Sequence, residues 1–150
     1  MTQMIEGRPS NTAMRVAMQR AVHQRLDMPI VFEDELAEQI LGSHVDLSSA
    51  DDYMTPSAKR LRAFLVARSR FAEDKLNEAM NAGVRQYVIL GAGLDTFAYR
   101  NPDDDLRVFE VDFPATQQWK RSCLRAAGIT IPGSVKYVPI DFAKDSLKEE

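Results

Sequence analysis

The stretch VILGAGLDT, residues 88–96, carries an apolar run directly into two glycines that are one position apart. The run over residues 86–90 is short, β-favouring and flanked by glycines, which predicts a buried strand. Glycines directly after such a strand allow a ligand to approach the backbone closely in doubly wound α/β folds. Gly91 and Gly93 therefore predict a ligand-binding turn, with a plain tight turn as the alternative.

Two further strand units follow the glycine turn. The pattern predicts one or two helical turns over 95–100, strands over 106–111 and 135–140, and a helix over 114–127 that begins with a proline. Strands that alternate with helices indicate an α/β domain with a parallel sheet. Such sheets normally have more strands and helices on both faces, so these three strands are predicted to form the first half of one.

The residues before the first strand are predicted to be mainly helical. Apolar spacing and capping residues predict helices over 11–26, 34–41 and 57–81, with the polar stretch 42–56 as a loop. The predicted stripe of the first helix, at spacings of three and four, consists of Met14, Ala17, Met18, Ala21, Val22 and Arg25. The stripe of the long helix consists of Leu61, Phe64, Leu65, Ala72, Leu76 and Met80. The chain is thus predicted to divide into a helical region, 1–82, and a strand-containing region, 83–150.

Composition is that of an ordinary globular domain. The chain has 150 residues, of which 45% are apolar and 27% charged, and its net charge is -3. The lack of a basic surplus argues against a nucleic-acid partner, and no apolar run is long enough to cross a membrane. A single cysteine cannot form a disulfide within the chain and fits a reducing compartment. Since the polar N-terminal residues contain no apolar signal segment, we expect a cytoplasmic protein.

An acidic residue ends the second predicted strand. Asp112 lies nineteen residues after Gly93, and an acid at this spacing and position accepts hydrogen bonds from ribose hydroxyls in doubly wound folds. Glu110 lies two positions earlier and points the same way, so we expect it to be solvated or to support the site. Asp112 is the preferred ligand-binding acid, because it lies closer to the edge of the sheet where ligands bind.

The end of the third predicted strand repeats this pattern with Asp141 and Phe142. An acid there can bond an adenine amino group while the aromatic ring packs against the base, although an acid that ends a strand also serves as a turn or helix cap. Thr96 occupies the sixth position of the glycine pattern, so the match to G-x-G-x-x-G is incomplete. The incomplete match disfavours a ligand with a pyrophosphate.

The remaining candidate residues are predicted to be structural. They are Cys123, His23, His44, Tyr99, Arg100 and the acidic runs 51–52 and 103–105. We expect the cysteine to pack in a helix and the histidines to lie at the surface or cap helices. The tyrosine and arginine are expected to pack around the glycine turn. The acidic runs are expected to be solvated rather than to hold a metal ion.

Six segments together resemble a known enzyme family. They are NTAMRVAMQRAVHQ (11–24), VFEDELAEQILG (31–42), ARSRFAED (67–74), RQYVILGAGLDTFAYR (85–100), VFEVDFPATQQWKR (108–121) and VPIDF (138–142). In this order they resemble the S-adenosylmethionine-dependent methyltransferases related to leucine carboxyl methyltransferase, in particular a large bacterial group. The resemblance implies a Rossmann-like methyltransferase fold, in which N-terminal helices precede the first three parallel strands of an incomplete doubly wound sheet.

The resemblance also implies S-adenosyl-L-methionine as the cofactor. The backbone of Gly91, Ala92 and Gly93 would approach the methionine part, and Asp112 would bind the ribose hydroxyls. These roles follow from the matching positions of the family pattern.

Four further residues receive roles from the same resemblance. Asp141 and Phe142 would hold the adenine. An arginine of the ARSR segment, either Arg68 or Arg70, would pair with the carboxylate of the cofactor. The sequence does not choose between these two arginines.

The activity that the resemblance implies is transfer of a methyl group to a carboxylate or hydroxyl oxygen of an unidentified acceptor, and the chain shows no evident catalytic residue. Family members are roughly twice this length. An alternative is therefore a truncated cofactor-binding or interaction module without catalysis, and a nicotinamide-dependent oxidoreductase is a weaker rival. An unfinished sheet would also leave an edge open to self-association.

Overall fold

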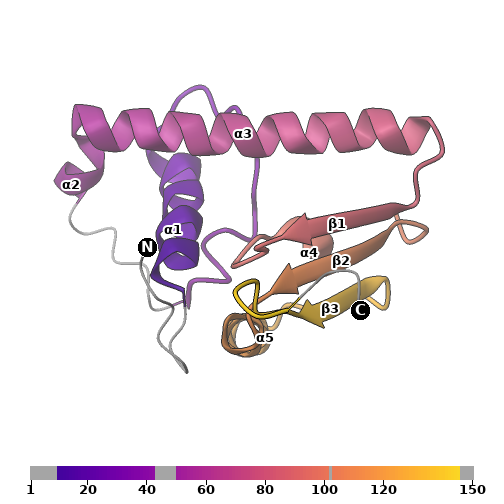
Figure 1. Cartoon of the computed structure of the whole chain (residues 1–150). Coiled ribbons are helices and arrows are strands. Elements are labelled where there is room, and N and C mark those ends of the chain that lie inside the picture. The colour runs from indigo at the N-terminus through magenta and orange to yellow at the C-terminus, as the bar shows by residue number, and fades with distance from the viewer. Residues whose placement is uncertain (1–9, 43–49, 102, 146–150) are drawn as a thin grey trace.

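The computed structural model describes residues 10–42, 50–101 and 103–145. Helices occupy the first part of the chain, and a three-stranded sheet with two further helices occupies the second part (Figure 1). The expectation for His44 lies outside the described residues.

The two long helices are α1 (Asn11–Leu26) and α3 (Pro56–Asn81). Each begins at a side-chain cap. The hydroxyl of Ser10 accepts the amide of Ala13 at 3.2 Å, and the hydroxyl of Thr55 accepts an amide of the first turn of α3, also at 3.2 Å. The predicted bounds of both helices are confirmed to within a residue.

The segment between the long helices differs from the prediction. Residues 35–41, predicted as a helix, form consecutive turns whose hydrogen bonds mix three- and four-residue spacing. Asp34 starts the segment by accepting the amide of Leu36 at 3.2 Å, which is a local side-chain bond that competes with helix formation. The predicted loop contains a short helix, α2 (Ala50–Met54), directly before α3.

The sheet confirms the α/β prediction. Strands β1 (Gln86–Leu90), β2 (Arg107–Asp112) and β3 (Val135–Pro139) are parallel and adjacent in the order β1-β2-β3. The short helix α4 (Phe97–Arg100) connects the first two strands, and α5 (Pro114–Ala126) connects the second and third.

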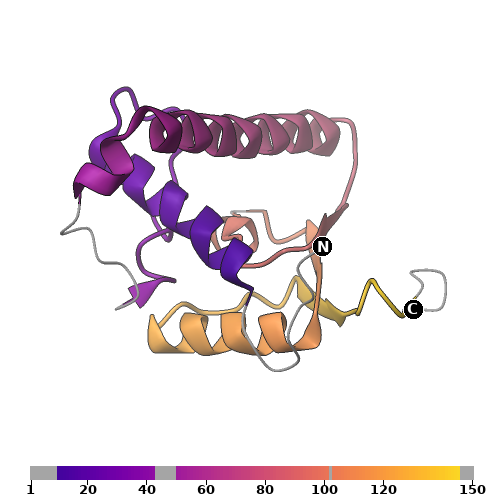
Figure 2. The ribbon, with the colours of Figure 1, turned by 60° about the vertical axis from the view of Figure 1, so that its left-hand side comes forward.

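Helices α4 and α5 pack against the same face of the sheet, because Tyr99 and Lys120 both bond to the side chain of Glu110 on β2. The opposite face is partly uncovered along β1, where Val88 and Leu90 are exposed. Helix α1 lies beyond the carboxyl ends of the strands and beneath α3 (Figures 1 and 2). The glycine turn therefore lies at the junction of α1 and the sheet.

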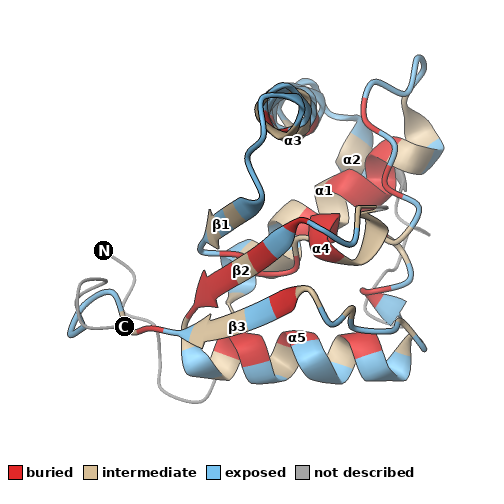
Figure 3. Ribbon diagram, turned by 90° about the vertical axis from the view of Figure 1, so that its right-hand side faces the viewer, coloured by how far each residue is buried: buried red, intermediate tan, exposed pale blue. Residues whose placement is uncertain are grey.

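One core cluster joins the helices to the glycine turn. Its buried members are Ala17, Ala21, Ala37, Ile40, Leu41, Leu94 and Leu124. Leu94 directly follows the turn, so burial of this one side chain attaches the turn to α1 and α5. Figure 3 shows buried residues gathered on α1, α4 and β2, whereas much of α3 is exposed.

Both predicted helix stripes need correction. On α1, Arg25 is exposed and pairs with Glu38 at the surface, whereas Arg20 is buried. On α3, Phe64 is 62% exposed, whereas Arg62 is fully buried. Arg20 and Arg62 were missed because a pattern of apolar residues alone does not count a paired arginine as a core residue.

Candidate functional site

The turn after β1 adopts a conformation that requires its glycines. The φ angle is 66° at Gly91 and 49° at Gly93, in the left-handed region that other residues rarely adopt. The amides of Gly91 and Ala92 donate to the carbonyl of Val111 at 2.8 and 3.2 Å, which fixes the turn against the end of β2. The turn therefore presents backbone atoms at the carboxyl edge of the sheet.

The two glycines differ in their surroundings. A Cβ at Gly93 would lie 2.8 Å from the Cβ of Ala13, so this glycine allows α1 to pack directly on the turn. A Cβ at Gly91 would have no atom within 4 Å, so the space beside this glycine is open. Close packing therefore explains Gly93 without a ligand, whereas Gly91 borders space that a ligand can enter.

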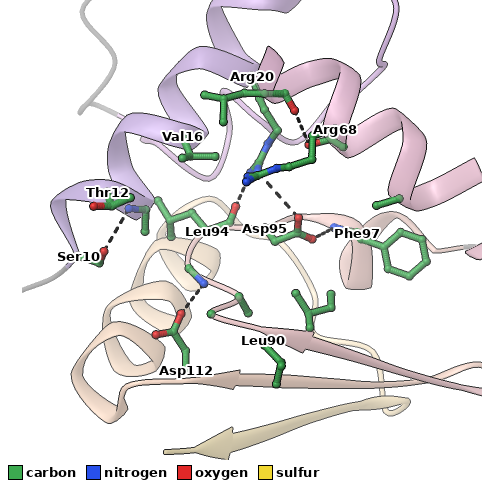
Figure 4. A pocket seen from close by; sticks show the side chains of 18 of the residues that line it. Ser10, Thr12, Val16, Arg20, Arg68, Leu90, Leu94, Asp95, Phe97 and Asp112 are labelled. Carbon is green, nitrogen blue, oxygen red and sulfur yellow. Dashed lines mark hydrogen bonds and ion pairs between the residues drawn. The ribbon is translucent and has the colours of Figure 1, made fainter. Parts of the chain in front are cut away.

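A cavity of about 780 Å³ lies between the turn, the N-terminal part of α1 and the middle of α3 (Figure 4). The charged residues of its lining are Arg15, Arg20, Arg68, Glu73, Asp95 and Asp112. Three are cations and three are anions, so the cavity suits a ligand that carries groups of both signs.

Asp112 lies at the end of β2 and borders this cavity. Its Oδ2 accepts the amide of Gly93 at 2.5 Å, and its Oδ1 accepts the amide of Phe113 at 2.7 Å. Each carboxylate oxygen has a second lone pair, so both can still accept a hydrogen bond from a ligand hydroxyl. The acid and the turn thus form one connected unit.

The structure separates the two arginines of the ARSR segment. Arg68 lines the cavity from α3, and its guanidinium carbon lies 6.0 Å from the centre of the Phe64 ring. Arg70 does not line the cavity, and its Nε donates to both carboxylate oxygens of Asp74 at 2.9 Å on the exposed surface. Of the two, Arg68 is the one that can reach a ligand beside the turn.

Asp141 and Phe142 lie at the same edge of the sheet but outside this cavity. Asp141 borders an open hollow of about 410 Å³ together with Phe113. Its Oδ1 accepts the amide of Ala143 at 3.1 Å, and its Oδ2 lies 3.3 Å from Nζ of Lys144. In the described structure Asp141 therefore caps a turn, which is the alternative role considered for it. Phe142 is exposed.

Sequence patterns did not single out Arg20, whose contacts fix the end of the glycine turn. Its Nη2 donates to the carbonyl oxygen of Leu94 at 2.6 Å, and its Nη1 lies 3.9 Å from Oδ2 of Asp95. A signal was present, since Arg20 lies three positions after Ala17 on the apolar side of the first helix. A charged residue in such a position indicates a buried polar partner.

Glu73 is a second residue that the sequence did not single out. It lines the cavity from α3 and accepts a hydrogen bond from Nη2 of Arg100 at 2.5 Å. Burial raises the pKa of the Glu73 carboxyl, and the hydrogen bond from Arg100 opposes this effect. Arg100 also donates to Thr96 at 3.1 Å, so the expected packing of this arginine around the turn is confirmed.

Glu110 is not solvated, contrary to one of the two roles expected for it. It is fully buried and accepts hydrogen bonds from Lys120 at 2.7 Å and from Tyr99 at 3.1 Å. Burial raises the pKa of the Glu110 carboxyl, although Lys120 lowers it. Tyr99 also shares a 2.7 Å hydrogen bond with Tyr137, and it packs against the core cluster that contains Leu94 beside the turn, as expected.

His23 is also buried, contrary to the surface position that was one of the two roles expected for it. Its Nδ1 lies 2.8 Å from Oδ2 of Asp27, and its Nε2 accepts the amides of Val31 and Phe32 at 3.2 and 3.4 Å. With both nitrogens engaged by the protein, the imidazole connects α1 to the following segment. The predicted packing of Cys123 is confirmed, since it lies partly buried against the core.

Within residues 10–42, 50–101 and 103–145, no group of three or more histidine, cysteine or acidic side chains is arranged to hold a metal ion. Across the same described residues, no helix combines the length and apolar character that a membrane span requires.

Comparison with known proteins identifies the family. The sequence model of leucine carboxyl methyltransferase matches residues 13–150. A Bacillus subtilis protein named "Putative S-adenosyl-L-methionine-dependent methyltransferase YktD" is 37% identical, and the alignment covers 90% of this chain and 53% of that protein. Proteins of Mycobacteroides abscessus and Mycolicibacterium gilvum, which carry the same name without the last word, are 35% and 32% identical. Each alignment covers 89% of this chain, and 46% and 48% of the relative.

The chain thus spans about half the length of these curated relatives. The matched residues include the glycine turn, the ends of the three strands and the helices that line the cavity. Because the family match extends over nearly the whole chain, the chain belongs to the leucine carboxyl methyltransferase family.

Proposed function

We propose that the cavity beside the glycine turn binds S-adenosyl-L-methionine, and that the chain forms the cofactor-binding part of a methyltransferase. The observation that carries this proposal is that the turn, Asp112 and Arg68 border one cavity although they come from three separate segments. The names of the relatives support the choice of cofactor.

The methionine end of the cofactor carries an ammonium and a carboxylate, and the cavity contains partners for both. We assign the carboxylate to Arg68, since Arg70 lies outside the cavity and is occupied by Asp74. The backbone of Gly91, Ala92 and Gly93 borders the same cavity, and the left-handed turn leaves room for close approach there. Charged hydrogen bonds of this kind orient a ligand as well as bind it.

The adenosyl end is assigned to the edge formed by β2 and β3. Asp112 has free acceptor positions for ribose hydroxyls, and its burial strengthens such bonds. Asp141 and Phe142 are assigned to the adenine, since the amide of Ile140 donates to the carbonyl of Asp112 at 2.9 Å and joins the two strand ends. In this assignment Asp141 exchanges its contact with Lys144 for one with the base.

The proposed reaction is methyl transfer to a carboxylate or hydroxyl oxygen of an acceptor. The cofactor supplies a methyl group that its positive sulfonium makes electrophilic. The residues of this chain would hold the methionine and ribose groups and exclude water, so that the acceptor oxygen lies in line with the breaking bond. A carboxylate acceptor has no proton to remove, which agrees with the absence of an assigned catalytic base.

Calorimetric titration of the chain with S-adenosylmethionine, S-adenosylhomocysteine and NADH tests this proposal. We expect the first two to bind at one site and NADH not to bind. Failure of both sulfur ligands would refute the proposed function. Binding without transfer of a labelled methyl group to carboxylic or hydroxylic acceptors would favour the alternative of a non-catalytic cofactor-binding module.

Two further proposals concern the self-association of the chain and its location in the cell. Among the described strands β1 lies at an edge of the sheet and exposes Val88 and Leu90, which supports self-association there, since an uncovered sheet edge accepts another strand. Light scattering across a dilution series would detect self-association as a concentration-dependent mass.

The free thiol of Cys123 is compatible with a cytoplasmic location, which fractionation of cells would test.

A further inference from the structure

Helix α1 contacts the glycine turn at two points. Ala13 packs against Gly93 so closely that a Cβ on the glycine would lie 2.8 Å away. Two helical turns later, Arg20 donates to the carbonyl of Leu94 at 2.6 Å. The two contacts hold Gly93 and the next residue, Leu94, against a single helix, so a shift of α1 would move the turn.

A buried carboxylate holds the guanidinium of Arg20 in this position. Nε of Arg20 donates to Oδ2 of Asp34 at 3.1 Å, and the two side chains are 5% and 0% exposed. The same Oδ2 accepts the hydroxyl of Thr96 at 2.7 Å, and Oδ1 lies 3.3 Å from Nε of Arg100. Asp34 therefore links α1 to Thr96, directly before α4, and to Arg100, at the end of α4.

The charges make this arrangement resistant to rearrangement. A buried carboxylate that loses its cationic partner is strongly destabilised, so Asp34 keeps Arg20 and Arg100 beside it. The guanidinium is a planar fork, and when one nitrogen bonds to Asp34 the direction of the others is fixed toward Leu94. Leu94 and its neighbour Asp95 both line the cavity, so the network ends at the proposed ligand site.

We propose that Arg20 and Asp34 are positioning residues, which hold residues 93–96 in the arrangement that binds S-adenosylmethionine. The inference rests on the proposed function, because it assigns the pair to affinity for that cofactor. Arg20 acts through the turn, since its hydrogen bonds go to Leu94 and Asp34. Without them the turn would sample other conformations, and only the fraction with a formed site would bind.

Calorimetric titration of the whole chain and its variants with S-adenosylmethionine tests the inference. Arg20→Lys removes the fork while keeping the charge, and Asp34→Asn removes the charge while keeping the shape. Thr96→Val removes one hydroxyl from the network, and this hydroxyl caps no helix. Arg25→Met is the matched control, since Arg25 joins α1 to Glu38 of the same segment as Asp34 and lies at the surface, away from the turn.

We expect about ten-fold weaker binding for Arg20→Lys and Asp34→Asn, about three-fold weaker binding for Thr96→Val, and unchanged binding for Arg25→Met. A purely structural role would lower the thermal midpoint but leave the affinity of the folded chain unchanged. Hydrogen exchange without cofactor gives a second measurement. Amides of residues 92–96 should exchange faster in Arg20→Lys and at the wild-type rate in Arg25→Met.

Wild-type affinity in folded Arg20→Lys and Asp34→Asn would overturn the inference, as would an equal loss in the control. If these two variants do not fold, the affinity of Thr96→Val for the cofactor is the test. Unchanged affinity in this variant would contradict the inference. If the wild-type chain does not bind the cofactor, the proposed function fails instead. The exchange comparison would then still show whether Arg20 orders the turn.

Discussion

The amide of Gly93 donates a hydrogen bond of 2.5 Å to the carboxylate of Asp112, nineteen positions later in the chain. The bond joins the turn after β1 to the end of β2, so the backbone and the acid of the proposed site cannot move independently. The parallel register places the two strand ends side by side, because Leu90 pairs with Val111. The spacing between glycine and acid is thus the chain length needed to pass through α4 and return along β2.

Asp112→Asn should weaken the binding of S-adenosylmethionine about 100-fold. The amide keeps the shape of the side chain but loses its charge. It also replaces one acceptor atom with an NH2 group, which cannot accept a hydrogen bond from a ribose hydroxyl or from the Gly93 amide. Titration calorimetry at fixed ionic strength measures the change. Asp104→Asn, in an exposed turn, is the control and should bind as the wild type does. Equal affinity for Asp112→Asn and the wild type would contradict the ribose assignment.

Gly93→Ala should lower the free energy of unfolding by about 3 kcal/mol. About 1 kcal/mol comes from the left-handed φ, and the remainder from overlap with the Cβ of Ala13. Urea denaturation measures the loss. Gly133→Ala is the matched control, since neither its φ nor a neighbouring atom opposes a Cβ, and we expect a change within about 0.5 kcal/mol.

A second variant separates the two causes at Gly93. Ala13→Gly removes the atom with which the new Cβ overlaps. The loss in free energy of unfolding of the double variant should therefore be smaller, by at least about 1 kcal/mol, than the sum of the losses in the two single variants. Exact additivity would show that α1 does not press on the turn as the structure describes.

Arg68→Met should weaken cofactor binding about ten-fold or more, whereas Arg70→Met should leave it unchanged. Arg68 lines the cavity, and Arg70 is paired with Asp74 at the surface. The two variants lose the same charge from the same helix, so each controls for the other. Binding that is weakened equally in both would indicate a general effect of charge, and a loss in Arg70→Met alone would reverse the assignment.

Stability should fall as the pH falls from about 4 toward 2, and Asp27 should cause part of the loss. Two hydrogen bonds of 2.7 Å from Arg62, with a further one from His23, lower the pKa of the Asp27 carboxyl to about 2 from its ordinary value of 3.8. A lowered pKa contributes stability that is complete above the unfolded pKa and is lost as the pH falls through the folded one. Unfolding midpoints measured between pH 2 and pH 6 record this loss.

Asp27→Asn should show a smaller acid dependence and should be less stable than the wild type by about 3 kcal/mol at pH 7, because Arg62 is left buried without its partner. Asp74→Asn breaks an exposed pair instead and should change stability by less than about 1 kcal/mol. An unchanged acid dependence in Asp27→Asn would show that this carboxylate does not titrate as its contacts require.

The strand ends and the glycine turn could be predicted from sequence because their signals are local. Glycines at 91 and 93 follow a β-favouring run directly, and the acid at 112 ends the next such run. Their meeting at one edge then follows from the parallel sheet. The choice between Arg68 and Arg70 needed the structure, since it depends on the side of α3 that faces the turn.

The network around Arg20 could not be predicted in the same way. Its contact with Leu94 spans seventy-four positions, and that with Asp34 spans fourteen. Local patterns contain no information on such pairs, which depend on how α1 approaches the sheet. The pair between buried Arg62 and partly exposed Asp27 was missed for the same reason.

S-adenosylmethionine is proposed to bind in the cavity between the glycine turn, α1 and α3, with its adenine at the adjoining end of β3. The most direct measurement is a titration of the isotope-labelled chain with S-adenosylmethionine, followed by NMR of its backbone amides. Binding as proposed would give saturable shifts centred on residues 91–95 and 112–113, with smaller shifts near Arg68 and at residues 141–142. Absence of saturable shifts, or shifts centred away from the carboxyl edge of the sheet, would contradict it.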